Sequence, residues 1–270
     1  MARLTAPDLL RRKPSPDAPS PDRITMITAY DAQMARLVDA AGIDMVLVGD
    51  SLGMVFQGGK DTLSVTVDDM AYHGRCVAAG LSRAHLTVDM PFMSYQVSVK
   101  QAMKTAGKLM QKGQAQSVKL EGGVRSAPAI RAIVEAGIPV VGHVGLTPQS
   151  VHAFGGFRVQ GREKENAERI LEDAHAVAAA GAFAIVLEMV PHALAAQITQ
   201  ALAIPTIGIG AGPACDGQVL VCTDMLGMDQ SFTPKFLQRY ANLEQTITEA
   251  VRAYVVDVKS GAFPTAAHSY

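Results

Sequence analysis

The chain has 270 residues, of which 49% are hydrophobic, and its formal net charge at pH 7 is −1. A chain without a long basic block lacks the electrostatic surface that nucleic-acid binding requires, so we expect a small-molecule partner. No stretch approaches the roughly 18 consecutive apolar residues of a membrane span. Cys76, Cys215 and Cys222 are irregularly spaced, which argues against a disulfide framework or zinc motif and indicates a cytoplasmic protein.

The N-terminal residues 1–22 are expected to form a short helix over residues 6–13 and then a proline-rich connection. This segment lacks the apolar core of a signal peptide. The rest of the chain, residues 23–270, is expected to form a single barrel domain, because no boundary of a second domain is visible in the sequence.

After this connection, short β-rich runs alternate with alanine-rich helical segments. Strands are predicted at residues 25–30, 45–50, 85–90, 117–121, 140–145, 183–189, 206–210 and 218–224. Helices are predicted at residues 31–41, 67–81, 98–112, 126–136, 163–180 and 191–202. Gly42, Gly113, Gly137 and Gly181 follow four of these helices, where a left-handed C-terminal cap favours glycine.

The alternation of apolar strands with helices predicts the fold class. It is typical of an α/β protein with a parallel sheet covered by helices. Eight such strands within about 200 residues favour a closed (β/α)8 TIM barrel. The connection between the last two strands is too short for a full helix, so an open, doubly wound sheet is the alternative.

Ionisable side chains end five consecutive predicted strands, and in a barrel these ends meet at the mouth that holds the active site. They are Asp50, Asp89, Lys119 with Glu121, His143 and Glu188. Lys119 and Glu121 are two residues apart and therefore point to the same side. A buried lysine needs carboxylates or an anionic ligand nearby. Any one of these residues alone would more often be a cap, a turn residue or a hydrogen-bonded core residue, but the set indicates an active site.

The carboxylates among these residues suggest metal chemistry. Asp50, Asp89 and Glu121 are oxygen donors whose mutual repulsion favours a cation, and oxygen-only ligation favours Mg²⁺. His143 would extend the choice to Mn²⁺, Co²⁺ or Zn²⁺. An α-keto acid could fill two open positions of the ion, which would stabilise the enolate as a Lewis acid. Glu188 is left as the candidate general base or acid.

The residues around Asp50 have further predicted roles. Ser51 and the first N–H groups of the following turn are candidates for holding a carboxylate, and Gly49 lets the chain turn. Val46 and Val48 are expected to fill the barrel layers beneath Asp50.

Two long polar loops and one glycine-rich segment complete the pattern. Residues 56–66 and 143–162 are candidates for a lid or substrate wall. The segment "GIGAG", residues 208–212, is followed by a proline and a strand instead of a helix, which argues against a dinucleotide site. Its glycines are interpreted as clearance for a ligand.

Seven segments in order resemble a known family. They are "TAYDA", "VGDSLGMV", "TVDMPFMSY", "VKLEGG", "GHVGLTPQSVHAFGGFRVQGR", "AIVLEMVP" and "IPTIGIGAG…DGQVLV". Over residues 4–243 the chain closely resembles the 3-methyl-2-oxobutanoate (ketopantoate) hydroxymethyltransferases. Two features depart from the family pattern: "GGKDTLSVT", which includes Lys60 and Asp61, stands where "GHDSTLPVT" is usual, and the connection over residues 13–21 is long.

The resemblance implies a barrel of the phosphoenolpyruvate/pyruvate type in a homo-oligomer, commonly a decamer. It implies transfer of a hydroxymethyl group from 5,10-methylenetetrahydrofolate to 3-methyl-2-oxobutanoate with Mg²⁺, giving ketopantoate in pantothenate and coenzyme A biosynthesis. By motif match, the metal residues are Asp50, Asp89 and Glu121. The matched substrate-binding residues are Asp50, Ser51, Asp89, Lys119 and His143. Glu188 matches the proton acceptor and donor.

Two alternatives stay open at this point. The first is a C–C lyase or mutase of the same superfamily acting on another α-keto acid, which "TVDMPFMSY" and "GLTPQSV" disfavour. The second is a metabolite-binding barrel that has lost catalysis, which the presence of all the metal carboxylates and Glu188 disfavours.

Overall fold

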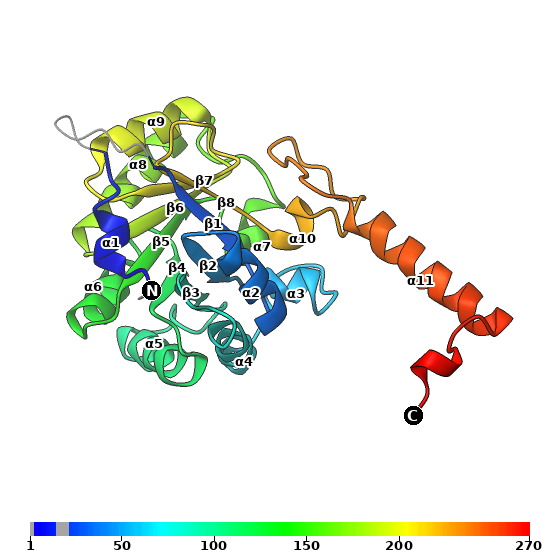
Figure 1. Cartoon of the computed structure of the whole chain (residues 1–270). Coiled ribbons are helices and arrows are strands. Elements are labelled where there is room, and N and C mark those ends of the chain that lie inside the picture. Colours follow the sequence, from blue (N-terminus) through cyan, green and yellow to red (C-terminus); the bar gives the residue numbers. More distant parts are fainter. Residues whose placement is uncertain (1–2, 15–21) are drawn as a thin grey trace. The chain divides into compact units, whose positions relative to one another are not determined.

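The computed structural model describes residues 3–14 and 22–270. Its eight strands are all parallel and form a closed barrel in sequence order, with the last strand paired to the first (Figure 1). The strands are β1 (Ile24–Thr28), β2 (Met45–Val48), β3 (His85–Asp89), β4 (Ser117–Glu121), β5 (Val140–Gly145), β6 (Ala184–Glu188), β7 (Thr206–Ile209) and β8 (Gly217–Leu220). The predicted closed barrel is therefore confirmed, and the open sheet is wrong.

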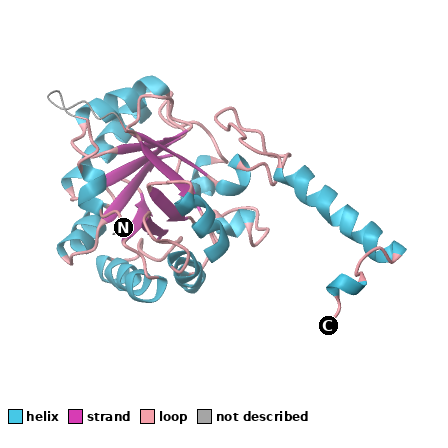
Figure 2. Cartoon of the chain, viewed as in Figure 1, coloured by secondary structure: helices cyan, strands magenta, loops and turns pink. Residues whose placement is uncertain are grey.

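Helices surround the strands of this barrel (Figure 2). They are α1 (Ala6–Leu10), α2 (Ala32–Ala40), α3 (Leu52–Val55), α4 (Val67–Ala78), α5 (Val99–Gly113), α6 (Ala127–Glu135), α7 (Val151–Phe154), α8 (Lys164–Ala179) and α9 (His192–Ala201), with a 3-10 turn η1 (Pro148–Ser150). Thr66 illustrates how the helices begin: its side chain accepts the N–H of Asp69, whose carboxylate accepts the N–H of Thr66.

The predicted glycine caps are confirmed at three of four positions. Gly42, Gly137 and Gly181 have φ values of 90°, 84° and 98°. Gly113 is instead the last residue of α5, and Gln114 adopts the left-handed conformation with a φ of 55°. The backbone of Gly113 packs closely against α4, because a Cβ atom on Gly74 of α4 would lie 2.7 Å from the carbonyl oxygen of Gly113.

The interior of the barrel is filled in layers by alternate residues of each strand. On β2 the interior residues are Met45 and Leu47, which belong to one apolar cluster with residues of β1, β5, β6, β7 and β8. The prediction that Val46 and Val48 fill the layers beneath Asp50 is wrong. The prediction assumed that side chains alternate between the two faces of the strand, counting back from Asp50. The strand ends at Val48, however, and the chain turns before the Asp50 carboxylate.

Helix α1 closes the amino-terminal end of the barrel. Its buried residues Ala6 and Leu9 join the apolar cluster of the barrel interior. Beyond the helix, Nζ of Lys13 forms an ion pair with Oδ2 of Asp216 at 2.8 Å. The expected helix is therefore present and docked, although it ends at Leu10. Most of the proline-rich connection lies outside the described residues.

His85 lies under this helix and should make folding stability depend on pH. Its Nδ1 is 3.1 Å from the carbonyl oxygen of Leu4, its Nε2 is 2.9 Å from Oγ of Ser117, and burial lowers its pKa to about 4. Since the unfolded pKa is near 6.5, folding favours the neutral ring. The contribution of His85 to the free energy of unfolding is fully present above about pH 6.5. It decreases by about 3 kcal/mol as the pH falls towards 4.

Urea denaturation at pH 7.5 and at pH 5 measures this dependence. The variant His85→Gln should lose less stability between the two pH values than the unmodified chain. Equal losses in both proteins would show that other groups carry the pH dependence.

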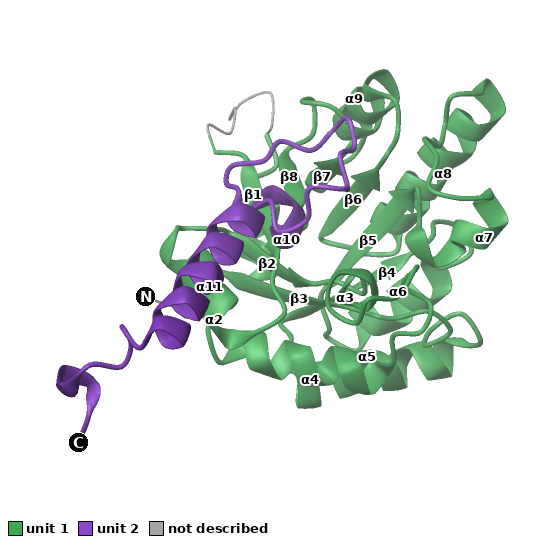
Figure 3. Cartoon of the chain, turned by 90° about the vertical axis from the view of Figure 1, so that its right-hand side faces the viewer, with its two compact units in different colours: residues 1–221 green, residues 222–270 purple. Residues whose placement is uncertain are grey.

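The chain forms two compact units, residues Met1–Val221 and Cys222–Tyr270 (Figure 3). The second unit contains α10 (Cys222–Met225), α11 (Leu243–Ser260) and a 3-10 turn η2 (Ala266–His268). The sequence analysis did not predict a boundary at this position, and the boundary expected after residue 22 stays a prediction. The last predicted strand is too long, because β8 ends at Leu220 and residues 222–225 are helical.

Helix α11 was not predicted, and none of its residues is buried. Four apolar side chains of this helix are each about half exposed or more: Ile247, Val251, Tyr254 and Val256.

Among all helices of the described residues, none is both long and apolar enough to cross a membrane.

Candidate active site

The strand ends bring five of the predicted residues to the interior of the barrel. Asp89 of β3 is the register partner of Lys119 on β4, and Glu121 is the partner of His143 on β5. Glu188 ends β6 and pairs with Gly145. The first four side chains are almost completely buried, whereas the side chain of Glu188 is 18% exposed. The prediction that these groups meet at one mouth is confirmed.

Asp50 reaches the same place from a turn beyond the end of β2. Its N–H donates to Oδ2 of Asp89 over 3.0 Å. Burial, together with the charges of Asp89 and Glu121, raises the pKa of Asp50 to about 8. Burial also raises the pKa of Asp89, against the opposing effect of Lys119. The site therefore holds more negative charge than the protein alone compensates.

Lys119 supplies the buried positive charge among these carboxylates. Its Nζ lies 2.9 Å from Oδ1 of Asp89. Burial alone would lower the pKa of this lysine, but Asp89, Glu121 and Asp50 raise it above its usual range, so the amine stays protonated. This arrangement meets the expectation that a lysine at this position needs carboxylates around it.

His143 connects the carboxylates of the interior to Glu188. Its Nε2 is 3.1 Å from Oε2 of Glu188, and its Nδ1 is 3.5 Å from Oε1 of Glu121 and 3.2 Å from Nζ of Lys119. Burial and Lys119 lower the pKa of His143, but contacts with Glu121 and Glu188 outweigh them and raise it to about 9. The histidine is thus placed to pass a proton to or from Glu188.

Ser51 lies beside this network and bonds to another residue. Its Oγ is 2.8 Å from the hydroxyl of Tyr30. A Cβ atom on Gly49 would lie 2.8 Å from Oγ of Ser51 and 3.6 Å from Oδ2 of Asp89. Glycine at position 49 therefore leaves the room that Ser51 and Asp89 occupy at the mouth.

Two buried residues of the site, Gln149 and Tyr95, were missed by the sequence analysis. Gln149 lies on η1 in the loop after β5, and its amide Nε2 donates to Oδ2 of Asp50 over 2.8 Å. The hydroxyl of Tyr95 donates to Oε1 of Gln149 over 2.8 Å. Both lie within motifs that carry the family resemblance, but loop conformation decides which polar side chains of such a loop turn inwards.

Two glycines of the segment 208–212 lie against the protein's own side chains. A Cβ atom on Gly208 would lie 3.0 Å from Sγ of Cys215, and one on Gly212 would lie 2.6 Å from Cβ of His192. At these two positions the small residue makes room for the protein's own side chains. The interpretation of these glycines as clearance for a ligand stays a prediction.

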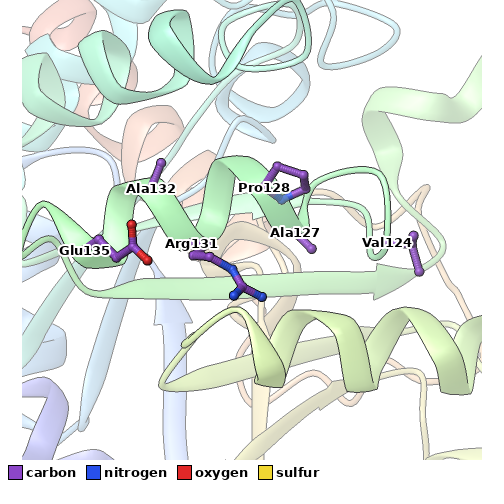
Figure 4. A pocket seen from close by; sticks show the side chains of 6 residues that line it. All are labelled: Val124, Ala127, Pro128, Arg131, Ala132 and Glu135. Carbon is purple, nitrogen blue, oxygen red and sulfur yellow. The ribbon is translucent and has the colours of Figure 1, made fainter.

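Two surface pockets lie near the site but outside it. One, of about 440 Å³, follows the outer side of α6 and is lined by Val124, Ala127, Pro128, Arg131, Ala132 and Glu135 (Figure 4). The other, of about 510 Å³, lies between the loops after β4 and β5 and helix α8. Their lining residues, all within the described chain, include none of the predicted site residues. The candidate active site is the buried polar cluster itself.

The residues of the cluster fit a magnesium ion. Oε1 of Glu121 is buried and makes no hydrogen bond within the described residues, so it has free acceptor capacity. No group of three or more Asp, Glu, His or Cys side chains is already arranged around a point in the described chain. Magnesium, however, is usually held by one or two protein carboxylates with water and substrate. Asp50 and Asp89 could supply these two, and this ligand set stays a prediction.

The fold is a parallel (β/α)8 barrel, and buried carboxylates, a lysine and a histidine lie at the carboxyl ends of its strands. This combination is typical of barrel enzymes, which have their active sites at that end. Solved structures with the same fold include a phosphoenolpyruvate phosphomutase from Streptomyces platensis subsp. rosaceus, at 16% identity and a TM-score of 0.62, covering 96% of this chain and 88% of that one. A 2,3-dimethylmalate lyase matches at 18% identity and a TM-score of 0.57, covering 99% and 92%. These likenesses establish the fold of the chain.

The chain belongs to the ketopantoate hydroxymethyltransferase family, whose model matches residues 5–266. It is 59% identical over 268 residues to the 3-methyl-2-oxobutanoate hydroxymethyltransferase of Pelobacter propionicus, covering 99% of this chain and 97% of that protein. It is 58% identical over 248 residues to the enzyme of the same name from Trichlorobacter lovleyi, covering 92% and 93%. The family resemblance read from the sequence is confirmed.

Proposed function

We propose that the chain transfers a hydroxymethyl group from 5,10-methylenetetrahydrofolate to 3-methyl-2-oxobutanoate and so forms ketopantoate, in pantothenate and coenzyme A biosynthesis. The names of close relatives over nearly the whole chain support this reaction. The observation that carries it is the buried cluster, in which a cationic lysine lies among carboxylates and a histidine leads to Glu188. The same relatives argue against a lyase or mutase.

Asp50 and Asp89 would hold the magnesium ion, with Glu121 as a third acidic group acting directly or through water. The bound ion would act as a Lewis acid towards the keto acid and lower the free energy of removing its C3 proton. Two vicinal oxygens of an α-keto acid suit the open positions that such a site leaves to substrate.

The side chains of this chain bind and orient the keto acid and move its proton. Lys119 and Ser51 bind the substrate at its oxygen atoms, as the motif match implies. Glu188 accepts the C3 proton, and the electron pair left on C3 attacks the methylene carbon of the iminium form of the folate, whose C=N π electrons return to nitrogen. Water then replaces that nitrogen on the carbon, which breaks the remaining C–N bond and gives the hydroxymethyl group and tetrahydrofolate. His143, 3.1 Å from Oε2 of Glu188, lies against that carboxylate and can exchange a proton with it.

An exchange experiment tests the proposed function and its need for metal. The protein is incubated with 3-methyl-2-oxobutanoate and Mg²⁺ in D₂O, and the C3–H signal is followed by NMR before methylenetetrahydrofolate is added. We expect loss of the C3–H signal, then ketopantoate, with both stopped by EDTA and restored by Mg²⁺. Exchange without product would instead indicate a lyase, and exchange that EDTA leaves unchanged would contradict the metal-dependent mechanism.

We also propose that the chain works as a cytoplasmic homo-oligomer, commonly a decamer in the resembling family. The exposed apolar side chains of α11 support assembly, because isolated chains rarely leave so many apolar groups in water. The free thiols of Cys76 and Cys215 suit a reducing compartment. Light scattering on the purified protein measures the number of chains, and a monomer would contradict the assembly.

A further inference from the structure

Gln149 has an unusual position for a residue of a surface loop. It lies on η1, between β5 and α7, yet it is only 6% exposed. A buried amide needs partners for its two donors and its acceptor, since an unpaired polar group in the interior costs about 1–3 kcal/mol. The identity of those partners shows what the residue does.

All polar groups of the Gln149 side chain are used, and they face the carboxylates of the site. Nε2 donates to Oδ2 of Asp50 over 2.8 Å and to the carbonyl oxygen of Met90 over 3.0 Å. The backbone N–H of the same residue donates to Oε2 of Glu121 over 3.1 Å. A single loop residue therefore fixes one oxygen on each of two carboxylates, one in the turn after β2 and one at the end of β4.

The direction of the Gln149 amide is set by the groups around it. The carbonyl of Met90 can only accept, so the NH₂ end must face it. On the other side, Tyr95 accepts the N–H of Glu121 over 3.1 Å, which leaves its own hydroxyl hydrogen for Oε1 of Gln149. Gln96 donates to the same Oε1 over 3.1 Å. The amide is thus locked with its donors towards Asp50.

We propose that Gln149 is a positioning residue that orients the carboxylates of Asp50 and Glu121 for cation binding and ties the loop after β5 to the site. This inference rests on the proposed function, because it assigns these carboxylates to the metal. With Oδ2 of Asp50 and Oε2 of Glu121 held by Gln149, the remaining oxygen of each carboxylate is left for the ion or its water. Groups that orient metal ligands in this way typically contribute 10–100-fold to metal affinity or activity.

The variant Gln149→Met tests the proposal, because it keeps the length of the side chain and removes its hydrogen bonds. Titration calorimetry with Mg²⁺ alone should show a Kd raised roughly 10–100-fold over the unmodified protein. Most of the lost turnover should return when Mg²⁺ is raised above the new Kd. Rescue by excess metal is an effect that a purely structural role would not produce.

Gln116→Met is the matched control. Its amide also makes two hydrogen bonds, from the N–H of Leu86 over 3.1 Å and to the carbonyl of Leu4 over 3.0 Å, at the opposite end of the barrel. The control variant should melt at a lower temperature than the unmodified protein but bind Mg²⁺ with unchanged Kd. A second test variant, Tyr95→Phe, keeps Gln149 and removes the hydroxyl that fixes its amide, so its Kd should also rise.

The outcomes separate this proposal from the proposed function. Unmodified protein that binds Mg²⁺ while Gln149→Met and Tyr95→Phe bind it equally well would overturn the role of Gln149 alone. Unmodified protein that binds no Mg²⁺ would overturn both. Weaker binding in the two site variants, with normal binding in Gln116→Met, supports the positioning role.

Discussion

Replacing Glu188 by glutamine should reduce the rate of ketopantoate formation by roughly 10²–10⁴-fold, the range found when a general acid or base is removed. The amide keeps the size of the side chain but has no basic oxygen to take the C3 proton. Deuterium exchange at C3 should fall by the same factor, because exchange needs only the proton-removal step. Binding of the keto acid should change little.

The measurement compares steady-state turnover and C3–H exchange in the unmodified and Glu188→Gln proteins, with Mg²⁺ saturating. Glu135→Gln, an exposed substitution on the outer side of α6, serves as the control and should keep full activity. Full turnover in the Glu188 variant would refute the assigned role. Loss of product with normal exchange would assign Glu188 to the later folate step instead of proton removal.

Replacing Lys119 by methionine should both abolish activity and destabilise the metal-free protein. Without the ammonium group, Asp89 loses the ion pair with Lys119 and His143 is the remaining cation beside the carboxylates, and breaking a buried charge pair costs about 3–5 kcal/mol. The pH dependence has a definite sign. The pKa of Asp50 is raised to about 8 in the folded protein. The contribution of Asp50 to the free energy of unfolding is therefore present at low pH and is lost as the pH rises towards 8.

Urea denaturation in EDTA checks the Lys119 prediction. The free-energy loss of Lys119→Met should be larger at pH 8 than at pH 5, because the carboxylates take up protons at the lower pH. Lys164→Met, whose side chain is 84% exposed on α8, should leave stability within about 0.5 kcal/mol of the unmodified protein. A Lys119 variant as stable as this control at pH 8 would show that the lysine does not compensate the buried carboxylates.

Much of the fold could be predicted because barrel strands are buried on both faces and read as apolar runs. The polar strand ends could be predicted for the same reason: Asp89, Glu121 and His143 stand out where the apolar run stops. Gln149 could not be found in this way. It lies in a loop with no periodic pattern, and its burial depends on how the residues after β5 fold back over the site.

Errors occurred where a local pattern was extended by one or two residues. Val46 and Val48 were assigned to the barrel interior by counting back from Asp50, which lies in a turn after the strand and no longer obeys the alternation. Gly113 was assigned to a cap, but the helix continues through it, and its carbonyl oxygen lies against Gly74 of α4. In both cases the local pattern did not show where the strand or the helix ends.

The interior of the barrel has two chemically different ends. At the amino-terminal end, Leu9 of α1 and Met45 of β2 lie in an apolar cluster, and at the other end lie buried carboxylates. Burial of the apolar side chains at one end stabilises the fold. Burial of the charged side chains at the other end costs free energy but places them for the reaction. Substitutions at opposite ends of the same eight strands can therefore change folding stability and catalytic activity almost independently.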